Sequence, residues 1–238
     1  WADVPRTYHY YSKWSTAVGI RIVVTGIGIV SPIGLSADTT WESLLAGKSG
    51  VDYISSFDSE PFETRIAAEV KEFEPTDFLD RKEARRMDRF VQFATVASQE
   101  AAAKARLNLD KEEAERVSVM IGSGIGGIRT LSQELQVLLE RRPSKVNAFL
   151  IPMMLGDMAS GRVSMLLGAK GPNFSAISSC ATGADTIGEA SEIIRRGDAD
   201  VAIAGGSEAA ICPIGIAGFN ACGALSRRNH DPQKASRP

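Results

Sequence analysis

The sequence predicts an α/β fold with a largely parallel β-sheet. Three observations lead to this fold class: β-rich runs recur along the chain, helical patterns separate them, and short glycine-containing turns join the two. The hydrophobic fraction of 44% is sufficient for a sizeable core. In order along the chain, we expect strands at 21–28, 64–70, 116–122, 173–178 and 200–208.

Helical patterns fill the segments between these strands. The first helix opens at Asp38 and is closed by Gly47, and Pro143 ends a later one. A helix rich in small residues and methionine starts near Pro152, and we expect it to be buried on several sides. From apolar spacing and these boundary residues, we expect helices at 38–47, 80–105, 128–141, 152–168 and 181–197.

Composition argues against several classes of function. The formal net charge of −2 gives no global reason to expect nucleic acid or an anionic membrane as a partner. No uncharged apolar run reaches the roughly 18 residues of a transmembrane helix. The three cysteines are too few for a disulfide framework and lack metal-ligand spacing, so we expect no metal and a cytoplasmic location.

The two ends of the sequence differ from the part between them. Residues 1–20 are aromatic and polar without a regular period, so we treat them as an unassigned extension. If they are the remains of a leader, the compartment would be a plastid or a mitochondrion. The last residues, NHDPQKASRP, form a polar loop with no closing element, so we expect a domain over 21–238 that is truncated at its C-terminus.

The sequence SSCATG, residues 178–183, places Cys180 where a predicted strand ends and a helix begins. Unpaired backbone N–H groups and the helix dipole at such a position stabilise a thiolate, and the same groups can stabilise an oxyanion. Cys180 is therefore a candidate nucleophile. The alternative is a small buried apolar residue, the commonest role of a free cysteine. Cys212 and Cys222 lack this setting, and we interpret them as structural.

The glycine-rich sequence GSGIGG, residues 122–127, follows a predicted strand and precedes a helix. This pattern formally matches a dinucleotide-binding turn. Such a site also needs an acidic residue at the end of a second strand some 20 residues on, and the chain there is helical. Close packing of the turn against another element explains the glycines as well, and we prefer that interpretation.

Basic residues gather at the start of the helix predicted over 80–105. Their spacing of one, three and four residues places them on one helix face or its approach. Acidic residues are interleaved with them, which is typical of a solvated helix with ion pairs. The functional alternative is a docking surface for an acidic partner. The basic residues are Arg81, Lys82, Arg85, Arg86 and Arg89.

Six blocks of the sequence resemble the β-ketoacyl-[acyl carrier protein] synthases, and most of all their type II elongating enzymes. The resemblance runs from about residue 21 to the last residue, and the blocks follow one another in the order expected of that family. They are VVTGIGIVSPIG (23–34), RKEARRMDRF (81–90), IGSGIGG (121–127), GPNFSAISSCATGA (171–184), GDADVAIAGGSEAA (197–210) and GFNACGALSRRNHDPQKASRP (218–238).

The resemblance implies a thiolase-like fold with two α/β halves in αβαβα layers, of which this chain is the N-terminal half, and it implies a homodimer. Cys180 would take an acyl chain from acyl carrier protein, and malonyl-carrier protein would lengthen it by decarboxylative condensation. Ile125 and Phe219 would line the acyl pocket. The substrates travel on the phosphopantetheine of the carrier, so no further cofactor is expected. The carrier would dock on Arg81, Lys82, Arg85 and Arg86.

The chain also departs from the family pattern. The two catalytic histidines of the family lie in motifs that are absent here, and neither His9 nor His230 falls in one. We therefore predict that the 238-residue chain alone does not catalyse condensation, and that an apolar face is left uncovered. Gly223 stands where many relatives have an arginine, which puts one contact at the pocket edge or with the carrier in question.

Three other functions are alternatives to this one. A polyketide-type ketosynthase shares the fold and the cysteine, although the compact blocks and Ile125 favour the fatty-acid enzyme. A non-catalytic partner of a ketosynthase typically lacks the cysteine, so Cys180 argues against that role. The interpretation of the chain as a nucleotide-binding protein would rest on the sequence GSGIGG alone.

Overall fold

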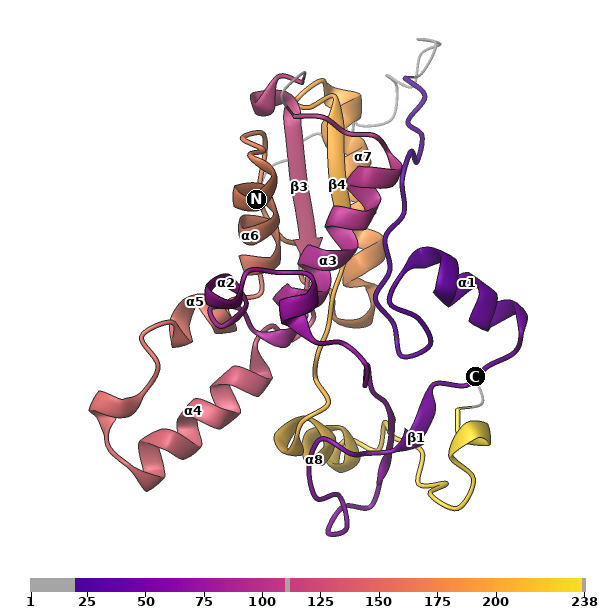
Figure 1. Ribbon diagram of the computed structural model, residues 1–238, viewed down its shortest axis with the longest axis vertical. Helices are drawn as coiled ribbons and strands as arrows, with labels where there is room; N and C mark the ends of the chain where they lie inside the picture. The colour runs from indigo at the N-terminus through magenta and orange to yellow at the C-terminus, as the bar shows by residue number, and fades with distance from the viewer. Residues whose placement is uncertain (1–19, 110–111, 237–238) are drawn as a thin grey trace, which may run out of the picture.

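The computed structural model describes residues 20–109 and 112–236. At its centre lie two parallel strands, β3 (Val117–Gly122) and β4 (Val201–Gly206), with helices on both sides (Figure 1). Gly122 lies opposite Gly206 in the register of the pair. Because the strands are parallel, their carboxyl ends meet at one edge, where ligand sites of α/β folds lie.

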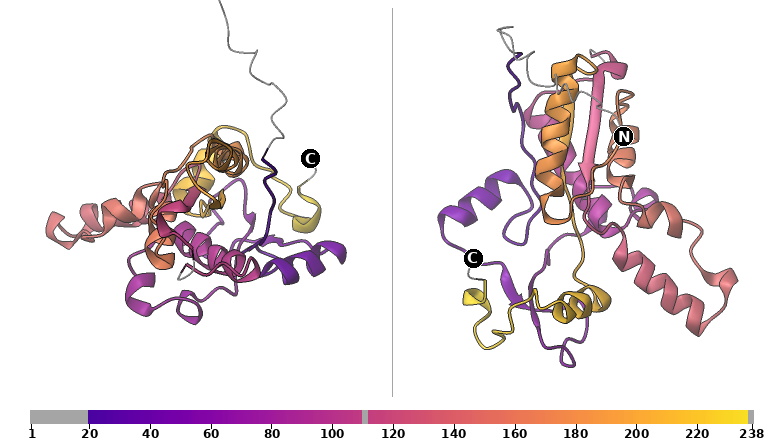
Figure 2. Two further views of the ribbon diagram at one scale, coloured as in Figure 1. Left: turned by 90° about the horizontal axis from the view of Figure 1, so that it is seen from above. Right: turned by 180° about the vertical axis from the view of Figure 1, so that it is seen from behind.

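Helices cover both faces of this strand pair. Helices α3 (Arg89–Lys104) and α6 (Met158–Leu167) pack on one face, and α7 (Thr182–Arg196) packs on the other (Figures 1 and 2). Alternate side chains of β3 point to opposite layers, so Met120 joins α7 in one apolar cluster. The other cluster, shared with α3 and α6, contains the β3 residues Val117, Val119 and Ile121. Every residue of β3 is buried, as expected for a strand covered on both faces.

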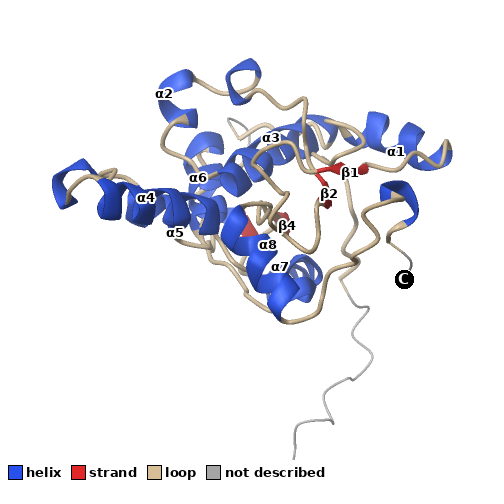
Figure 3. Ribbon diagram, turned by 90° about the horizontal axis from the view of Figure 1, so that it is seen from below, coloured by secondary structure: helices blue, strands red, loops and turns tan. Residues whose placement is uncertain are grey.

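The remaining elements surround this centre, and in Figure 3, seen from below, α4 and α1 lie on opposite sides of the molecule. A small antiparallel pair, β1 and β2, lies apart from the parallel pair. The helices and strands outside the central strand pair and its covering helices are α1 (Ala37–Leu45), β1 (Val51–Tyr53), β2 (Ile66–Ala68), α2 (Arg81–Ala84), α4 (Ile128–Glu140), α5 (Leu150–Met154) and α8 (Pro213–Ala221). Short 3-10 turns are η1 (Pro75–Asp77), η2 (Ala114–Arg116), η3 (Pro143–Lys145), η4 (Ser179–Ala181) and η5 (Pro232–Lys234).

Several sequence predictions are confirmed. Strands β3 and β4 lie within the ranges predicted for them, and α4 and α7 match their predicted helices to within one residue at each end. The strand predicted over 64–70 is present but spans only the three residues of β2. Helix α1 is also present, although Ser36 rather than Asp38 caps it: the Ser36 hydroxyl accepts a hydrogen bond from Thr39 N. The extension predicted at 1–20, with His9, lies outside the described residues except for Ile20.

Two predicted strands are wrong, so the parallel sheet is smaller than expected. Residues 21–28 run as extended chain along α3, where a Cβ at Gly28 would lie 1.8 Å from the carbonyl oxygen of Ala97. Among the described residues this segment pairs with no other strand, and an extended run becomes a strand only through a partner. Residues 173–178 contribute a single bridge, from Asn173 to Val119.

Two predicted helices are each broken into two. The helix expected over 80–105 is α2 followed by α3, because Asp88 has an extended backbone and its carboxylate accepts a hydrogen bond from Phe90 N. The helix expected from Pro152 is α5 followed by α6, with an extended residue at Leu155. Helix α6 is buried on one side only, since Met165 is 62% exposed.

The described residues expose many large apolar side chains, and two groups of them matter here. Val23 and Val24 are 63% and 77% exposed in the extended segment. Helix α4 projects away from the strand pair (Figures 1 and 2) and exposes a row of leucines. These are Leu131, Leu135, Leu138 and Leu139. An uncovered apolar face of this kind is typical of an interaction surface.

We predict that Asp88→Ala destabilises the protein by about 3 kcal/mol, because Asp88 is 2% exposed and binds Thr130 of α4 as well as capping α3. Urea unfolding followed by circular dichroism measures the loss. Asp80→Ala is the matched control, since Asp80 caps α2 at the surface, and we expect it to cost about 1 kcal/mol. Equal losses for the two variants would contradict this account of the break between α2 and α3.

Candidate active site

Cys180 lies in the turn that leads into α7, and it is exposed. The residue before it, Ser179, has a backbone φ of +54°, a left-handed conformation that is uncommon for a residue with a Cβ. No side chain caps the start of α7. Its first backbone amides therefore remain free of a capping side chain beside the thiol, which is the setting expected for an activated cysteine.

Two buried threonines anchor this turn to the carboxyl ends of the strands. The hydroxyl oxygen of Thr182 accepts a hydrogen bond from Ser178 N at 2.9 Å. The hydroxyl of Thr186 donates to the carbonyl oxygen of Gly205 in β4 at 2.7 Å. A Cβ on Gly122, at the end of β3, would lie 2.3 Å from Cγ2 of Thr182. The start of α7 is thus held directly against both strands.

The loop after β3 lies against the turn that carries Cys180. A Cβ on Gly124 would lie 3.2 Å from the carbonyl oxygen of Ser179, the residue before the cysteine. Ile125 follows and is 43% exposed. The fold therefore brings the predicted nucleophile and the predicted pocket residue Ile125 to the same edge of the strand pair.

The other glycines of GSGIGG are explained by close packing, as the sequence analysis preferred. Gly126 has a φ of +72°, and a Cβ there would lie 2.7 Å from the carbonyl oxygen of Met154. A Cβ on Gly127 would lie 2.3 Å from the carbonyl oxygen of Met153. Both contacts are with α5, so the loop needs glycine for backbone approach to a helix.

Glu208, two residues beyond β4, is a site residue that the sequence analysis missed. Its carboxylate accepts hydrogen bonds from the Ser123 hydroxyl at 3.1 Å, from Gly124 N at 2.9 Å and from Ile125 N at 3.1 Å. The available signal was an acidic residue two positions after a strand that ends in two glycines. The sequence alone does not reveal its role, because the loop that Glu208 binds is more than 80 residues away along the chain.

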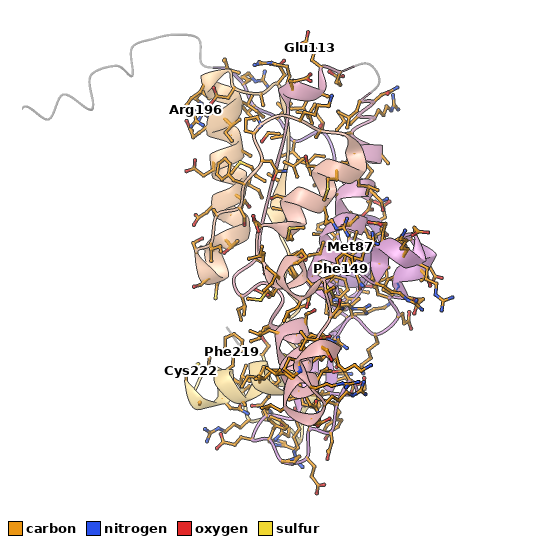
Figure 4. The ribbon with its side chains drawn as sticks, turned by 90° about the vertical axis from the view of Figure 1, so that its left-hand side faces the viewer. Met87, Glu113, Phe149, Arg196, Phe219 and Cys222 are labelled. Atoms are coloured by element: carbon orange, nitrogen blue, oxygen red, sulfur yellow. The ribbon has the colours of Figure 1, made fainter. Side chains whose placement is uncertain are left out.

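Phe219 lies on α8, together with Cys222 (Figure 4), and is 38% exposed. No hydrogen bond or ring contact within the described ranges joins Phe219 to Cys180 or Ile125. The predicted pocket residue Phe219 is therefore joined to neither Cys180 nor Ile125 by a contact of these kinds among the described residues. Cys212 is buried, and Cys222 is exposed at the end of α8.

A cavity of about 960 Å³ lies beside this edge, and Cys180 does not line it. Its walls include the guanidinium of Arg89, which lies 4.7 Å from the Phe73 ring and 4.8 Å from the Phe93 ring. Burial lowers the pKa of Arg89, and the nearby charge of Arg129 lowers it further. Arg89 therefore points inward and does not share a surface with the other basic residues of its segment.

The remaining basic residues form a surface on and beside α2. Arg81, Lys82 and Arg85 are exposed, and none of them has an ion pair within the part of the chain that the structure describes. Arg86 differs, because it pairs with Glu83 at 3.3 Å and stacks on the ring of Phe149 at 4.7 Å. We refer to Arg81, Lys82 and Arg85 as the α2 basic surface.

The described residues show neither a metal-binding cluster nor a membrane-spanning helix. Within 20–109 and 112–236, no group of three or more His, Cys, Asp or Glu side chains could hold a metal ion. Over the same residues, none of the helices combines the length and the apolar character needed to cross a membrane.

Comparison with known proteins gives three concordant similarities. Residues 20–238 match the family model described as the N-terminal domain of beta-ketoacyl synthase. A 3-oxoacyl-[acyl-carrier-protein] synthase 2 of Staphylococcus aureus (strain MRSA252) is 49% identical over 219 residues, which are 92% of this chain and 53% of that protein. The chain therefore spans about half the length of the curated relatives it matches.

Solved structures agree with this. A beta-ketoacyl synthase from Burkholderia phymatum STM815 superposes with a TM-score of 0.80 at 31% identity, covering 91% of this chain and 53% of that one. The ishigamide ketosynthase/chain length factor gives a TM-score of 0.77 at 29% identity over 86% of this chain and 51% of that one. The predicted thiolase-like α/β fold is confirmed.

We predict that Gly122→Ala costs about 2 kcal/mol of stability, because the new methyl group would overlap Thr182 and the carbonyl oxygen of Ala176. Gly188→Ala in the middle of α7 is the matched control. It meets no atom within 4 Å, so we expect a gain of about 0.8 kcal/mol from helix propensity. Thermal unfolding of both variants measures these effects, and a stable Gly122→Ala protein would argue against the close contact between β3 and α7.

Proposed function

The chain belongs to the beta-ketoacyl synthase family through that family's N-terminal domain, and on this basis we propose that it forms the acyl-accepting half of a 3-oxoacyl-[acyl carrier protein] synthase of fatty-acid elongation. The observation that carries the proposal is the placement of Cys180. It is an exposed thiol at the start of an uncapped helix, beside the carboxyl ends of two parallel strands. The activity of the whole protein is part of the proposal, because the chain covers 53% of its first relative.

The first chemical step follows from this placement. The thiolate of Cys180 attacks the carbonyl carbon of an acyl thioester on acyl carrier protein. A new carbon–sulfur bond forms on Cys180 and the bond to the carrier sulfur breaks. The carrier sulfur leaves as a thiolate, which takes up the proton that the Cys180 thiol released on ionisation. Backbone amides at the start of α7 would stabilise the negative charge on the carbonyl oxygen in the intermediate. Ile125 and Phe219 would line the path of the acyl chain.

Condensation follows in the proposed cycle. Malonyl-acyl carrier protein loses carbon dioxide, and its carbanion attacks the carbonyl carbon of the thioester on Cys180. A carbon–carbon bond forms, the carbon–sulfur bond to Cys180 breaks, and Cys180 leaves as a thiolate, so that the chain is longer by two carbons. No residue described here is assigned to decarboxylation: His230 is exposed in a loop. That the 238-residue chain alone does not condense stays a prediction.

The proposed partners are acyl carrier protein and a second copy of the chain. Unpaired cations on the α2 basic surface suit an acidic carrier, whose phosphopantetheine brings the substrate, so the proposal includes no other cofactor. The exposed leucines of α4 suit burial against a second copy in a homodimer. The proposed location is the cytoplasm.

A polyketide-type ketosynthase is the second candidate. Likeness to the ishigamide ketosynthase/chain length factor at 29% identity supports it. Identity of 49% to a 3-oxoacyl-[acyl-carrier-protein] synthase 2 favours the fatty-acid enzyme.

We predict that the protein from its own source, incubated with a long-chain acyl-carrier protein, gains the mass of the acyl group on Cys180. Intact mass spectrometry followed by peptide mapping measures this. Cys180→Ser should lose the adduct, whereas Cys222→Ser should keep it, since Cys222 is also exposed but lies at the end of α8. Acylation that persists in Cys180→Ser would refute the assignment of the nucleophile.

We also predict that reversing the α2 basic surface, with Arg81→Glu, Lys82→Glu and Arg85→Glu together, slows acylation from acyl-carrier protein by about tenfold at low salt. The rate of acylation from a carrier-free acyl thioester should not change, because the substitutions weaken only the docking of the carrier. Arg142→Glu with Lys145→Glu, two exposed cations beyond the end of α4, is the matched control and should leave both rates unchanged. Equal slowing with both donors would mean that the α2 basic surface does not dock the carrier.

A further inference from the structure

Glu208 fixes three consecutive residues of the loop after β3. One carboxylate oxygen accepts from the Ser123 hydroxyl, and the other accepts from the amides of Gly124 and Ile125. The Ser123 oxygen accepts in turn from Gly126 N at 2.9 Å, and Ser123 is 1% exposed. A single side chain from the end of β4 therefore sets the backbone of the loop that carries Ile125.

The same loop lies against both Glu208 and the turn of the nucleophile. A Cβ on Gly124 would lie 3.0 Å from the Glu208 carboxylate and 3.2 Å from the Ser179 carbonyl oxygen. A loop without its carboxylate partner would be free to shift along this contact. Any such shift changes the space next to Cys180.

Burial does not hold Ile125 in place, because its side chain is 43% exposed. The position of the Ile125 side chain therefore depends on the position of the Ile125 backbone. The backbone amide of Ile125 donates a hydrogen bond to the Glu208 carboxylate. A side chain that sets the size of a substrate path discriminates only when its backbone is fixed.

We propose that Glu208 is a positioning residue that determines which acyl chain lengths reach Cys180, by holding the backbone of Ile125 against the Cys180 turn. The inference rests on the proposed function, in which Cys180 accepts the acyl group and Ile125 lines its path. Glu208 does not touch the reacting atoms.

Glu69 offers a matched control elsewhere in the chain. Its carboxylate accepts from Ser55 N at 2.8 Å, from the Ser55 hydroxyl at 2.8 Å and from Ser56 N at 3.2 Å. This is the same set of donors, two successive amides and a serine hydroxyl, in a loop that does not carry Ile125. Glu69 is 8% exposed, whereas Glu208 is exposed, so removing the Glu69 carboxylate should destabilise the protein at least as much as removing that of Glu208. Glu69→Ala therefore controls for a general loss of stability.

The experiment compares acylation of Cys180 by short-chain and long-chain acyl-carrier proteins, using the protein from its own source with and without substitutions. The ratio of interest is the faster of the two acylation rates divided by the slower. Glu208→Ala should lower this ratio about fivefold toward unity, which is the size expected when hydrogen bonds to a solvated carboxylate are lost. Glu208→Gln should restore most of the ratio, because its amide oxygen still accepts from the loop. Alkylation of Cys180 by iodoacetamide should change less than about twofold in all variants, since this small reagent does not use the acyl path.

An unchanged ratio in Glu208→Ala, or an equal change in Glu69→Ala, would overturn the positioning role while leaving the proposed function intact. Absence of acylation on Cys180 in the unsubstituted protein would overturn both. If Glu208→Ala does not accumulate as folded protein, Gly124→Ala perturbs the same loop, because the new methyl group would crowd both the Glu208 carboxylate and the Ser179 carbonyl oxygen. The ratio of the two rates should then fall in the same way.

Discussion

The close contact between the start of α7 and the carboxyl ends of β3 and β4 is the constraint on which the rest of the structure depends. Gly122 and Gly206 let backbone segments approach more closely than a Cβ would permit. Thr182 and Thr186 are buried at this contact: the Thr182 hydroxyl accepts from Ser178 N within the turn, and the Thr186 hydroxyl donates to Gly205 in β4. Because this contact is steric and rigid, the turn between Ser178 and Thr182 has one position, and the thiol of Cys180 is presented beside the edge of the strands.

Carboxylates repeatedly fix the loops around this contact. Asp88 joins the start of α3 to the start of α4, Glu208 holds the loop after β3, and Glu69 holds residues 55 and 56. Glu100 accepts from the amides of Ile29 and Ala37. An acceptor with two oxygens satisfies several loop amides at once, which is how irregular backbone close to a core avoids unpaired donors. The loops near the candidate site are therefore positioned by side chains of distant segments.

The break before α3 also decides the electrostatics of the surface. Arg81, Lys82 and Arg85 lie on or next to α2 and remain exposed without ion pairs in the described part of the chain, whereas Arg89 starts a new helix and lies between aromatic rings. Neighbouring cations thus have opposite environments. Arg81, Lys82 and Arg85 are available to a partner, and the partly buried Arg89 contributes to packing beside the cavity.

The sequence by itself determined the elements whose cause is local. Glycine turns and apolar periods predicted β3, β4, α4 and α7, and SSCATG placed Cys180 at a helix start. Tertiary structure alone decided whether extended segments became strands, since residues 21–28 and 173–178 have the composition of strands but lack a ladder partner among the described residues. It also decided the role of Glu208, which is separated from its hydrogen-bond donors by more than 80 residues of chain. Hydrogen bonds between distant segments leave no periodic trace in a sequence, and for that reason only the fold could assign them.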